Sequence, residues 1–143
     1  MISIEHAPGL NASPITPDEL RALLVRVINE QTDASVDTIT VVLSPHTLVR
    51  SLNVQYLDHD YNTDVLAFNL GEEDDAIEGE VYVDVETAQE RHGEFDTSVR
   101  DEVTRYAVHG VLHLLGHTDK TDAGQAEMRR LEDHYVQSFE HSE

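Results

Sequence analysis

The 143-residue chain has no cysteine, which excludes a disulfide framework and a thiolate metal site. It also lacks any apolar run near the length of about 20 residues that spans a bilayer, and its first residues do not resemble a signal peptide. These absences predict a cytoplasmic protein with no membrane partner. The length fits a single domain with a proper buried core, and we expect that domain to cover residues 1–143.

Basic residues are scarce as well. Nine lysines and arginines stand against 29 aspartates and glutamates, and Lys120 is the single lysine. The formal net charge of −20 opposes non-specific binding of nucleic acid, because phosphate contacts come from lysine and arginine, and we expect no DNA partner. An acidic, lysine-poor surface stays soluble in a salty interior, where charge repulsion is screened. We therefore favour adaptation to a saline host as the origin of the acidity.

The apolar patterns predict nine elements in the order β-α-β-α-β-β-α-α-α. Thr16 followed by Pro17 marks the beginning of the first helix, and Ser44 followed by Pro45 repeats this cap-plus-proline pattern for the second. The expected strands cover residues 2–4, 36–43, 63–70 and 79–85, and the expected helices cover 17–31, 45–56, 86–92, 98–115 and 122–139. This order predicts an α/β fold with helices packed on a small mixed four-stranded sheet that includes one antiparallel hairpin.

Two histidines four residues apart, His109 and His113, lie near the end of the fourth expected helix. Side chains at this spacing are neighbours on one helical face, with Cβ atoms about 5–6 Å apart. Both imidazoles can therefore bind one ion at the zinc–nitrogen distance of about 2.0–2.1 Å. Gly116 then allows the left-handed conformation that ends a helix, so that the chain can return toward the same ion. The segment predicts one Zn²⁺ per chain.

The third zinc ligand follows from geometry. On an unbroken helix His117 would lie roughly 12 Å along the axis from His109, too far to share its ion. Asp119 comes three residues after Gly116, where a returning loop can direct its carboxylate at the metal. We choose Asp119 as the third ligand and keep His117 as the reserve.

The metal segment and other motifs resemble the YbeY family of bacterial endoribonucleases. That family has His-Gly-x-Leu-His-Leu-x-Gly-x-Asp-His followed by Met-x-x-Leu-Glu, and upstream Leu-Asn-x-x-Tyr-Arg, Thr-Asp-Val-Leu-Ser-Phe and Gly-Asp-Ile-x-Ile. The matching segments here are residues 109–116, 128–132, 52–56, 63–68 and 79–83, and the likeness covers roughly residues 36–133. Within the second motif, Met128 is either an apolar floor beneath the site or a core residue, and Glu132 is interpreted as a solvated helix face.

The resemblance implies a metal-dependent hydrolase: a single-strand-specific endoribonuclease that uses zinc to mature ribosomal RNA, notably the 3′ end of the small-subunit RNA. It also implies a part in ribosome biogenesis and ribosome quality control. The implied partners are ribosomal RNA and the ribosome or its proteins.

Two departures of this chain from the family pattern matter for the site. Asp119 stands where the family has its third histidine, and aspartate is an acceptable zinc ligand at about 2.0–2.2 Å. Leu57 stands where the family has an arginine suited to holding a phosphate bidentately. Arg50 and His59 are our candidates to compensate for that arginine.

Three protein ligands leave one coordination position open, which is typical of a catalytic rather than a structural zinc. Such an ion polarises a phosphoryl oxygen or lowers the pKa of bound water, and both effects suit phosphodiester hydrolysis. His117 titrates near neutrality and follows the metal segment, so it is our candidate proton carrier.

Two alternative functions stay open at this point. The spacing of His109, His113 and Asp119 also matches metzincin-like zinc proteases, but Gly110 occupies the position of their catalytic glutamate and has no side chain to accept a proton. The other alternative is a non-catalytic ribosome-associated factor with a structural metal, which the scarcity of basic residues favours. Replacing His113 by alanine separates the readings, because loss of a structural metal unfolds the protein whereas loss of a catalytic one leaves it folded and inactive.

Overall fold

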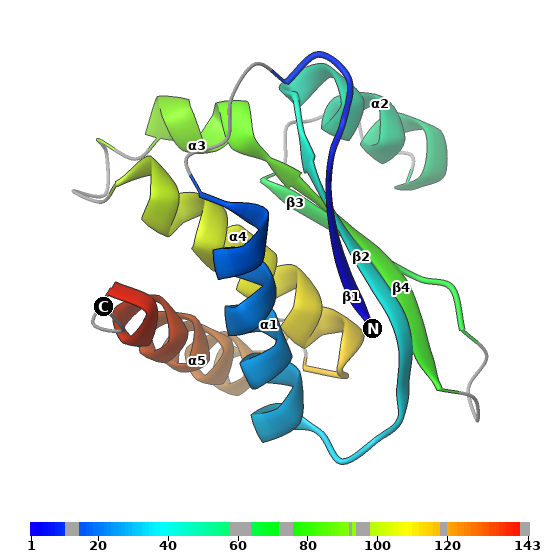
Figure 1. Ribbon diagram of the computed structural model, residues 1–143, viewed down its shortest axis with the longest axis vertical. Coiled ribbons are helices and arrows are strands. Elements are labelled where there is room, and N and C mark those ends of the chain that lie inside the picture. Colours follow the sequence, from blue (N-terminus) through cyan, green and yellow to red (C-terminus); the bar gives the residue numbers. More distant parts are fainter. Residues whose placement is uncertain are drawn as a thin grey trace.

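The computed structural model describes residues 1–10, 15–57, 64–71, 76–91, 93, 98–117 and 120–140. Within these residues the predicted order of elements is confirmed. The strands are β1 (Ile2–His6), β2 (Val36–Ser44), β3 (Val65–Asn69) and β4 (Ile77–Asp84), and the helices are α1 (Pro17–Gln31), α2 (His46–Leu57), α3 (Val85–Arg91), α4 (Val99–Leu114) and α5 (Asp122–Glu140) (Figure 1). The predicted α/β class is therefore correct, with small differences at the element boundaries.

The four strands form one mixed sheet in the order β1-β2-β4-β3. Strand β2 lies parallel to both β1 and β4, whereas β3 lies antiparallel to β4 with Ala67 opposite Val81. The expected hairpin is thus β3–β4. It places the start of β3 at the edge of the sheet beside the end of β4, where the Asp84 amide donates to the Asp64 carbonyl at 3.0 Å.

Helices cover the two faces of this sheet unequally. Side chains alternate along a strand, so Val81 and its neighbour Tyr82 point to opposite faces. Helix α4 packs on the Val81 face with α1 beside it against β1, and α5 packs against α4 and α1 (Figure 1). Helix α2 covers the Tyr82 face, where its Tyr56 ring lies 5.8 Å from the ring of Phe68. The main apolar core therefore lies between the sheet and the layer formed by α1, α4 and α5.

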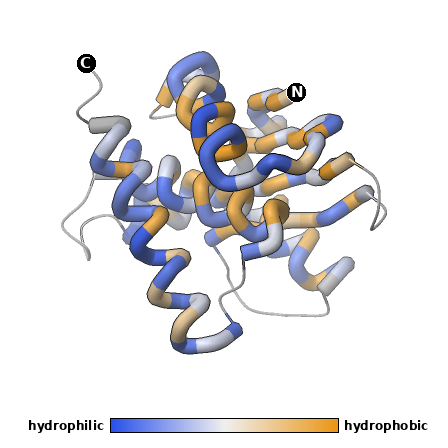
Figure 2. The backbone as a smooth tube through the Cα atoms, turned by 90° about the horizontal axis from the view of Figure 1, so that it is seen from below, coloured by the Kyte–Doolittle hydropathy of each residue, from blue (hydrophilic) through white to orange (hydrophobic). Residues whose placement is uncertain are grey.

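Hydropathy follows the same division, because apolar residues gather where the helices meet the sheet and polar residues lie on the outer turns (Figure 2). Helix α5 shows the contrast most plainly, with Leu131 and Tyr135 buried and Arg129 and Arg130 exposed. In the part of the chain that the structure describes, no helix combines the length and apolarity needed to cross a membrane.

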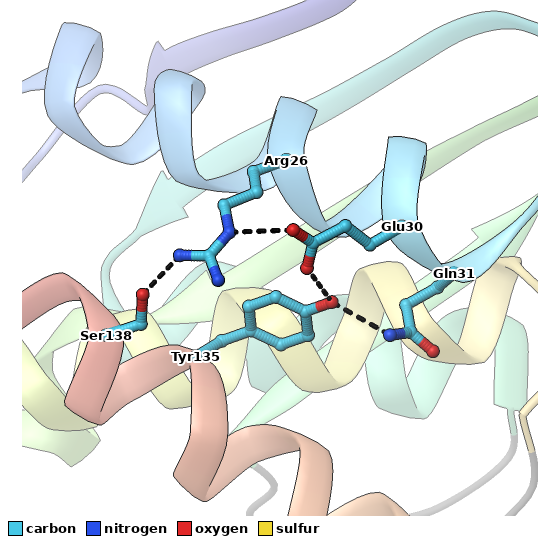
Figure 3. Close-up of polar contacts among 5 residues, drawn as sticks. All are labelled: Arg26, Glu30, Gln31, Tyr135 and Ser138. Carbon is cyan, nitrogen blue, oxygen red and sulfur yellow. Dashed lines mark hydrogen bonds and ion pairs between the residues drawn. The ribbon is translucent and has the colours of Figure 1, made fainter.

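A polar cluster joins the C-terminal half of α1 to α5 (Figure 3). The fully buried Tyr135 donates its hydroxyl to Glu30 at 2.9 Å and accepts a hydrogen bond from Gln31 at 2.8 Å. The Arg26 guanidinium bonds the other Glu30 oxygen at 3.0 Å, donates to the Ser138 hydroxyl and lies 5.6 Å from the centre of the Tyr135 ring. Because buried hydroxyl groups need partners, this cluster fixes the position of α5.

The two predicted helix caps have different outcomes. Thr16 caps α1 as expected, since its Oγ1 accepts a hydrogen bond from the Glu19 amide at 3.3 Å. The prediction that Ser44 caps α2 is wrong: Ser44 is the last residue of β2, is fully buried, and donates to the Val42 carbonyl. A residue distant in sequence, Glu86, accepts a hydrogen bond from the first α2 amide, that of His46, at 2.7 Å.

Helix α4 approaches the sheet closely because Gly110 has no side chain. A Cβ atom at Gly110 would lie 2.4 Å from Val81 Cγ1 and 3.1 Å from Val65 Cγ2. One turn further along α4, Leu114 fills a similar space, since a Cβ at Gly79 would lie 2.8 Å from its methyl groups. Two glycines, one on the helix and one on the strand, therefore set the depth at which α4 lies on β4.

We expect Gly110→Ala to destabilise the protein. Overpacking of a filled core costs about 1–3 kcal/mol, and an overlap this severe belongs at the upper end, beyond the gain of about 1 kcal/mol in helix propensity. Urea unfolding with a chelator present measures the change without any contribution from metal. Gly93→Ala is the matched control, because a Cβ there meets nothing within 4 Å. The double variant with Val81→Ala should lose less free energy than the sum of the two single variants; strict additivity would contradict this account.

Candidate metal centre

The end of α4 shapes the segment that carries the histidines. Gly116 has a φ of +103°, and its amide donates to the His113 carbonyl at 3.1 Å, while the His117 amide donates to the Leu112 carbonyl at 3.1 Å. This pair of hydrogen bonds with a left-handed glycine is the Schellman motif, which satisfies the last carbonyls of a helix. The predicted helix end at Gly116 is therefore confirmed, and the chain leaves the helix just after His113.

His109 is held by a carboxylate on another helix. Its Nδ1 lies 2.7 Å from Oε2 of Glu132 on α5, and Glu132 is only 9% exposed. When a neutral imidazole donates its Nδ1 proton to a carboxylate, its Nε2 carries the lone pair that a metal ligand needs. The carboxylate thus fixes both the tautomer and the ring orientation of His109.

Glu132 is in turn fixed by an arginine. Arg105 lies one turn before His109 on α4, and its guanidinium lies 3.4 Å from the second Glu132 oxygen and 2.8 Å from Asp133. Desolvation opposes the charged form of this guanidinium, but the hydrogen bonds and charges of the two carboxylates outweigh it and raise the pKa of Arg105. The chain of contacts runs from Arg105 through Glu132 to His109 and spans two helices.

The sequence interpretation of Glu132 as a solvated helix face is wrong. Glu132 follows Leu131 on α5, and the docking of α5 against α4 turns its side chain inward beside His109. The signal that could have found it was the Met-x-x-Leu-Glu motif itself. Met128, at the start of this motif, is 2% exposed and belongs to the hydrophobic core, in agreement with the second of the two interpretations.

The two histidines fit a zinc ion by their chemistry. His109 and His113 lie one turn apart on α4; the His109 side chain is 28% exposed, and His113 is exposed. Within the described ranges no three histidine, aspartate or glutamate side chains form a group that could hold a metal ion. The predicted third ligand, Asp119, lies outside the described residues, so the described part of the site consists of two imidazoles and the carboxylate that orients one of them.

Asp64, just before β3, lies near His109. Burial raises the pKa of the Asp64 carboxyl, while the charges of His109 and Arg91 act in the opposite direction. Its backbone carbonyl is fixed by the Asp84 amide at the sheet edge. A desolvated carboxyl beside a histidine pair is a common feature of functional sites, and it extends the site from α4 and α5 to the sheet.

The remaining predicted site residues lie at different places. His117 is half-buried after α4, close enough to Glu127 of α5 to lower the pKa of that carboxyl, although the largest cause there is the Arg130 hydrogen bond. Arg50 lies on α2, the helix that covers the opposite face of the sheet, beside a shallow hollow that includes Ser51 and Val54. His59 lies outside the described residues. The roles predicted for these residues, and for Asp119, stay predictions.

Comparison of the chain with known proteins shows its family. A family model described as "Endoribonuclease YbeY" matches residues 10–140. The chain belongs to the YbeY family. A family member from Salinibacter ruber, named endoribonuclease YbeY, is 46% identical over 94% of this chain and 89% of its own length. A second, from Chloroherpeton thalassium, is 33% identical over 89% of this chain and 90% of its own length.

A solved structure agrees with this assignment. The solution structure of TM1509 from Thermotoga maritima matches with a TM-score of 0.68 and 28% identity, covering 97% of this chain and 89% of that one. The resemblance found in the motifs is therefore confirmed, and the chain is a hydrolase of the endoribonuclease YbeY family.

We expect Glu132→Gln to weaken zinc binding while the protein stays folded. Loss of a carboxylate that orients a metal-binding histidine reduces metal affinity by about 10- to 100-fold. Competition with a chromophoric chelator measures the affinity, and circular dichroism confirms the fold. Glu127→Gln is the matched control, since it makes the same change on the exposed side of α5. Equal zinc affinities for the two variants would refute the orienting role of Glu132.

Proposed function

We propose that this chain is a zinc-dependent endoribonuclease that cleaves single-stranded ribosomal RNA. The observation that carries the proposal is the contact between Glu132 and His109, which prepares one imidazole as a metal ligand one helical turn from a second. Family membership supplies the reaction class, hydrolysis of RNA. Maturation of the 3′ end of the small-subunit RNA and a part in ribosome quality control are the biological roles that we propose, with the ribosome or its proteins as partners.

The residues proposed to hold the ion are His109, His113 and Asp119, with one Zn²⁺ per chain. When bound, the ion supplies a Lewis acid that polarises a phosphoryl oxygen of the substrate. Glu132 keeps the His109 ring in place, and we assign His117, directly after the helix end, to proton transfer. Arg50 and His59 stay our proposals for holding a phosphate in place of the family arginine, for which this chain has Leu57.

A zinc protease is disfavoured on two grounds. Gly110 lacks the carboxylate that such proteases use as a general base. Packing adds a second obstacle, because the Cβ direction at Gly110 points at Val81 and Val65 of the sheet. A glutamate at this position would meet the core before it could reach a substrate.

We expect His113→Ala to abolish RNA cleavage and zinc binding while the protein stays folded. The His113 side chain is exposed at the end of α4, so its loss leaves the core unchanged. Cleavage is measured on a single-stranded RNA with the mature small-subunit 3′ end, and folding by thermal melting of the variant and of the zinc-loaded wild type without a chelator. His6→Ala, which removes an exposed imidazole from β1, is the control and should retain full activity. Unfolding of the His113 variant would favour a structural metal instead.

Substitutions can distinguish the proposed roles of Asp119 as a metal ligand and His117 as a proton carrier. We expect Asp119→Ala to reduce zinc affinity strongly and Asp119→His to restore it, because histidine and aspartate are both good zinc ligands. We expect His117→Ala to keep the metal but to lower the cleavage rate by about 10²- to 10⁴-fold, the usual contribution of a general acid or base. The reverse pattern, with zinc lost from the His117 variant, would make His117 the third ligand.

A further inference from the structure

A cavity beside the histidines gathers three of the chain's nine basic side chains. It has a volume of about 460 Å³ and lies where α3, α4 and α5 meet the start of β3. Arg91 ends α3, Arg105 lies in α4 and Arg129 lies in α5, and all three line the cavity. Four acidic residues line the cavity as well, so its preference for an anion depends on which of these charges are already paired. We call it the arginine cavity.

The arginine cavity borders the metal centre through a shared residue. Glu132 lines the cavity and also holds Nδ1 of His109 at 2.7 Å, and Asp64 lines it from the sheet edge. A ligand in the cavity would therefore lie next to the residues proposed to bind zinc. The two sites would use different ring nitrogens of His109, because Nδ1 contacts Glu132 and Nε2 is the nitrogen that would bind zinc.

The guanidinium of Arg129 is available to a ligand. Its neighbour Arg130 forms an ion pair with Glu127 at 2.5 Å, whereas Arg129 forms none with the residues whose positions are described. Arg105 is instead fixed by Glu132 and Asp133. Among the described residues, Arg105 is thus preorganised and Arg129 is exposed without an ion-pair partner, and arginine binds phosphate bidentately with well-defined geometry.

Tyr106 provides an independent indication of a ligand. The residue is 5% exposed and lines the cavity, and its hydroxyl has no hydrogen-bond partner of good geometry within the described residues, although the Glu102 carboxyl lies close to it. A buried hydroxyl left without a partner costs free energy that a ligand oxygen would recover. Burial also raises the pKa of the Tyr106 phenol, so the group keeps its proton and can donate.

The carboxyl groups in the cavity do not cancel this preference. Glu132 and Asp133 are both in contact with Arg105, and Glu132 also with His109. The Asp64 carboxyl interacts electrostatically with Arg91 and His109. The fourth carboxyl, Glu102, is 4% exposed and lies beside the Tyr106 hydroxyl.

We propose that the arginine cavity binds a backbone phosphate of the RNA substrate beside the phosphodiester that is cleaved. Arg129 and Arg91 contact the phosphate oxygens, Tyr106 donates a hydrogen bond, and Arg105 contributes positive charge while keeping Glu132 in place. This inference rests on the proposed function, because it assigns a place to the same substrate. It also gives so acidic a chain a place to hold RNA, because three of its nine basic side chains line one cavity.

The test compares two neighbouring arginines on α5. Binding of a short single-stranded RNA to the zinc-loaded protein is measured by fluorescence anisotropy at several salt concentrations, using a backbone modified to resist cleavage. We expect Arg129→Gln to weaken binding about tenfold, the usual effect of losing a hydrogen bond to a charged group, and to reduce the salt slope by roughly 0.7. The control, Arg130→Gln, removes the same charge from a residue that is paired with Glu127 outside the cavity, and should bind like wild type.

A second variant tests the cavity without changing the charge. Tyr106→Phe removes one hydroxyl that has no described partner, so we expect unchanged thermal stability together with RNA binding weakened several-fold. Equal binding by the Arg129 and Arg130 variants, whether both match wild type or both are weakened alike, would overturn the cavity proposal. So would a Tyr106 variant that loses stability but binds RNA normally.

Failure of the proposed function gives a different result. If the wild-type protein binds RNA in a manner that depends on Arg129 but does not cleave the unmodified strand, the phosphate site stands and the nuclease assignment falls. If cleavage proceeds normally in the Arg129 variant with unchanged KM, the nuclease assignment stands and the cavity proposal falls.

Discussion

The hydrogen bond between Glu132 and His109 is the contact on which the candidate site depends. It joins the two helices α4 and α5, and it selects the imidazole tautomer that can bind a metal. The bond forms only if α5 is correctly placed, and that placement comes from the cluster of Arg26, Glu30 and Tyr135 one turn further along. Contacts between α1 and α5 that touch no substrate therefore determine the orientation of a residue in the site. The polar contacts that stabilise the packing of α5 on α1 thus also position Glu132 in the site.

Close packing of α4 on the sheet adds a second constraint. Gly110 brings the helix so near to β4 that the position has no space for any side chain. The absence of a side chain next to His109 is thus explained by packing, and it also removes the group that a zinc protease needs. Gly110 therefore has two effects. It lets α4 lie close to the sheet, and it leaves histidine, carboxylate and arginine side chains as the groups available for chemistry at the site.

Local patterns predicted the features that depend on neighbouring residues. The spacing of His109 and His113 and the helix end at Gly116 follow from helical geometry and from the left-handed conformation of glycine, so the sequence was sufficient for both. Glu132 was not predicted because its burial depends on how α5 docks, which no local pattern encodes. The Ser44 cap failed for a similar reason: pairing with β4 extends β2 through Ser44, and Glu86 takes its place as the cap. The arginine cavity is lined by residues of three different helices, so no local sequence pattern predicts it.

The chain is strongly acidic and its substrate, RNA, is an anion, so the two repel each other at long range. The placement of the arginines shows how the protein can bind RNA nonetheless. Long-range attraction cannot bring RNA to a protein with a net charge of −20. High salt, which we favour as the reason for this acidity, would weaken such attraction in any case. Binding must then come from short-range contacts that salt screens poorly, with partly buried and preorganised donors. The donors that we propose are Arg129, which lines the same cavity as the preorganised Arg105, and the buried Tyr106 hydroxyl, so the site does not need the basic surface that most RNA-binding proteins present.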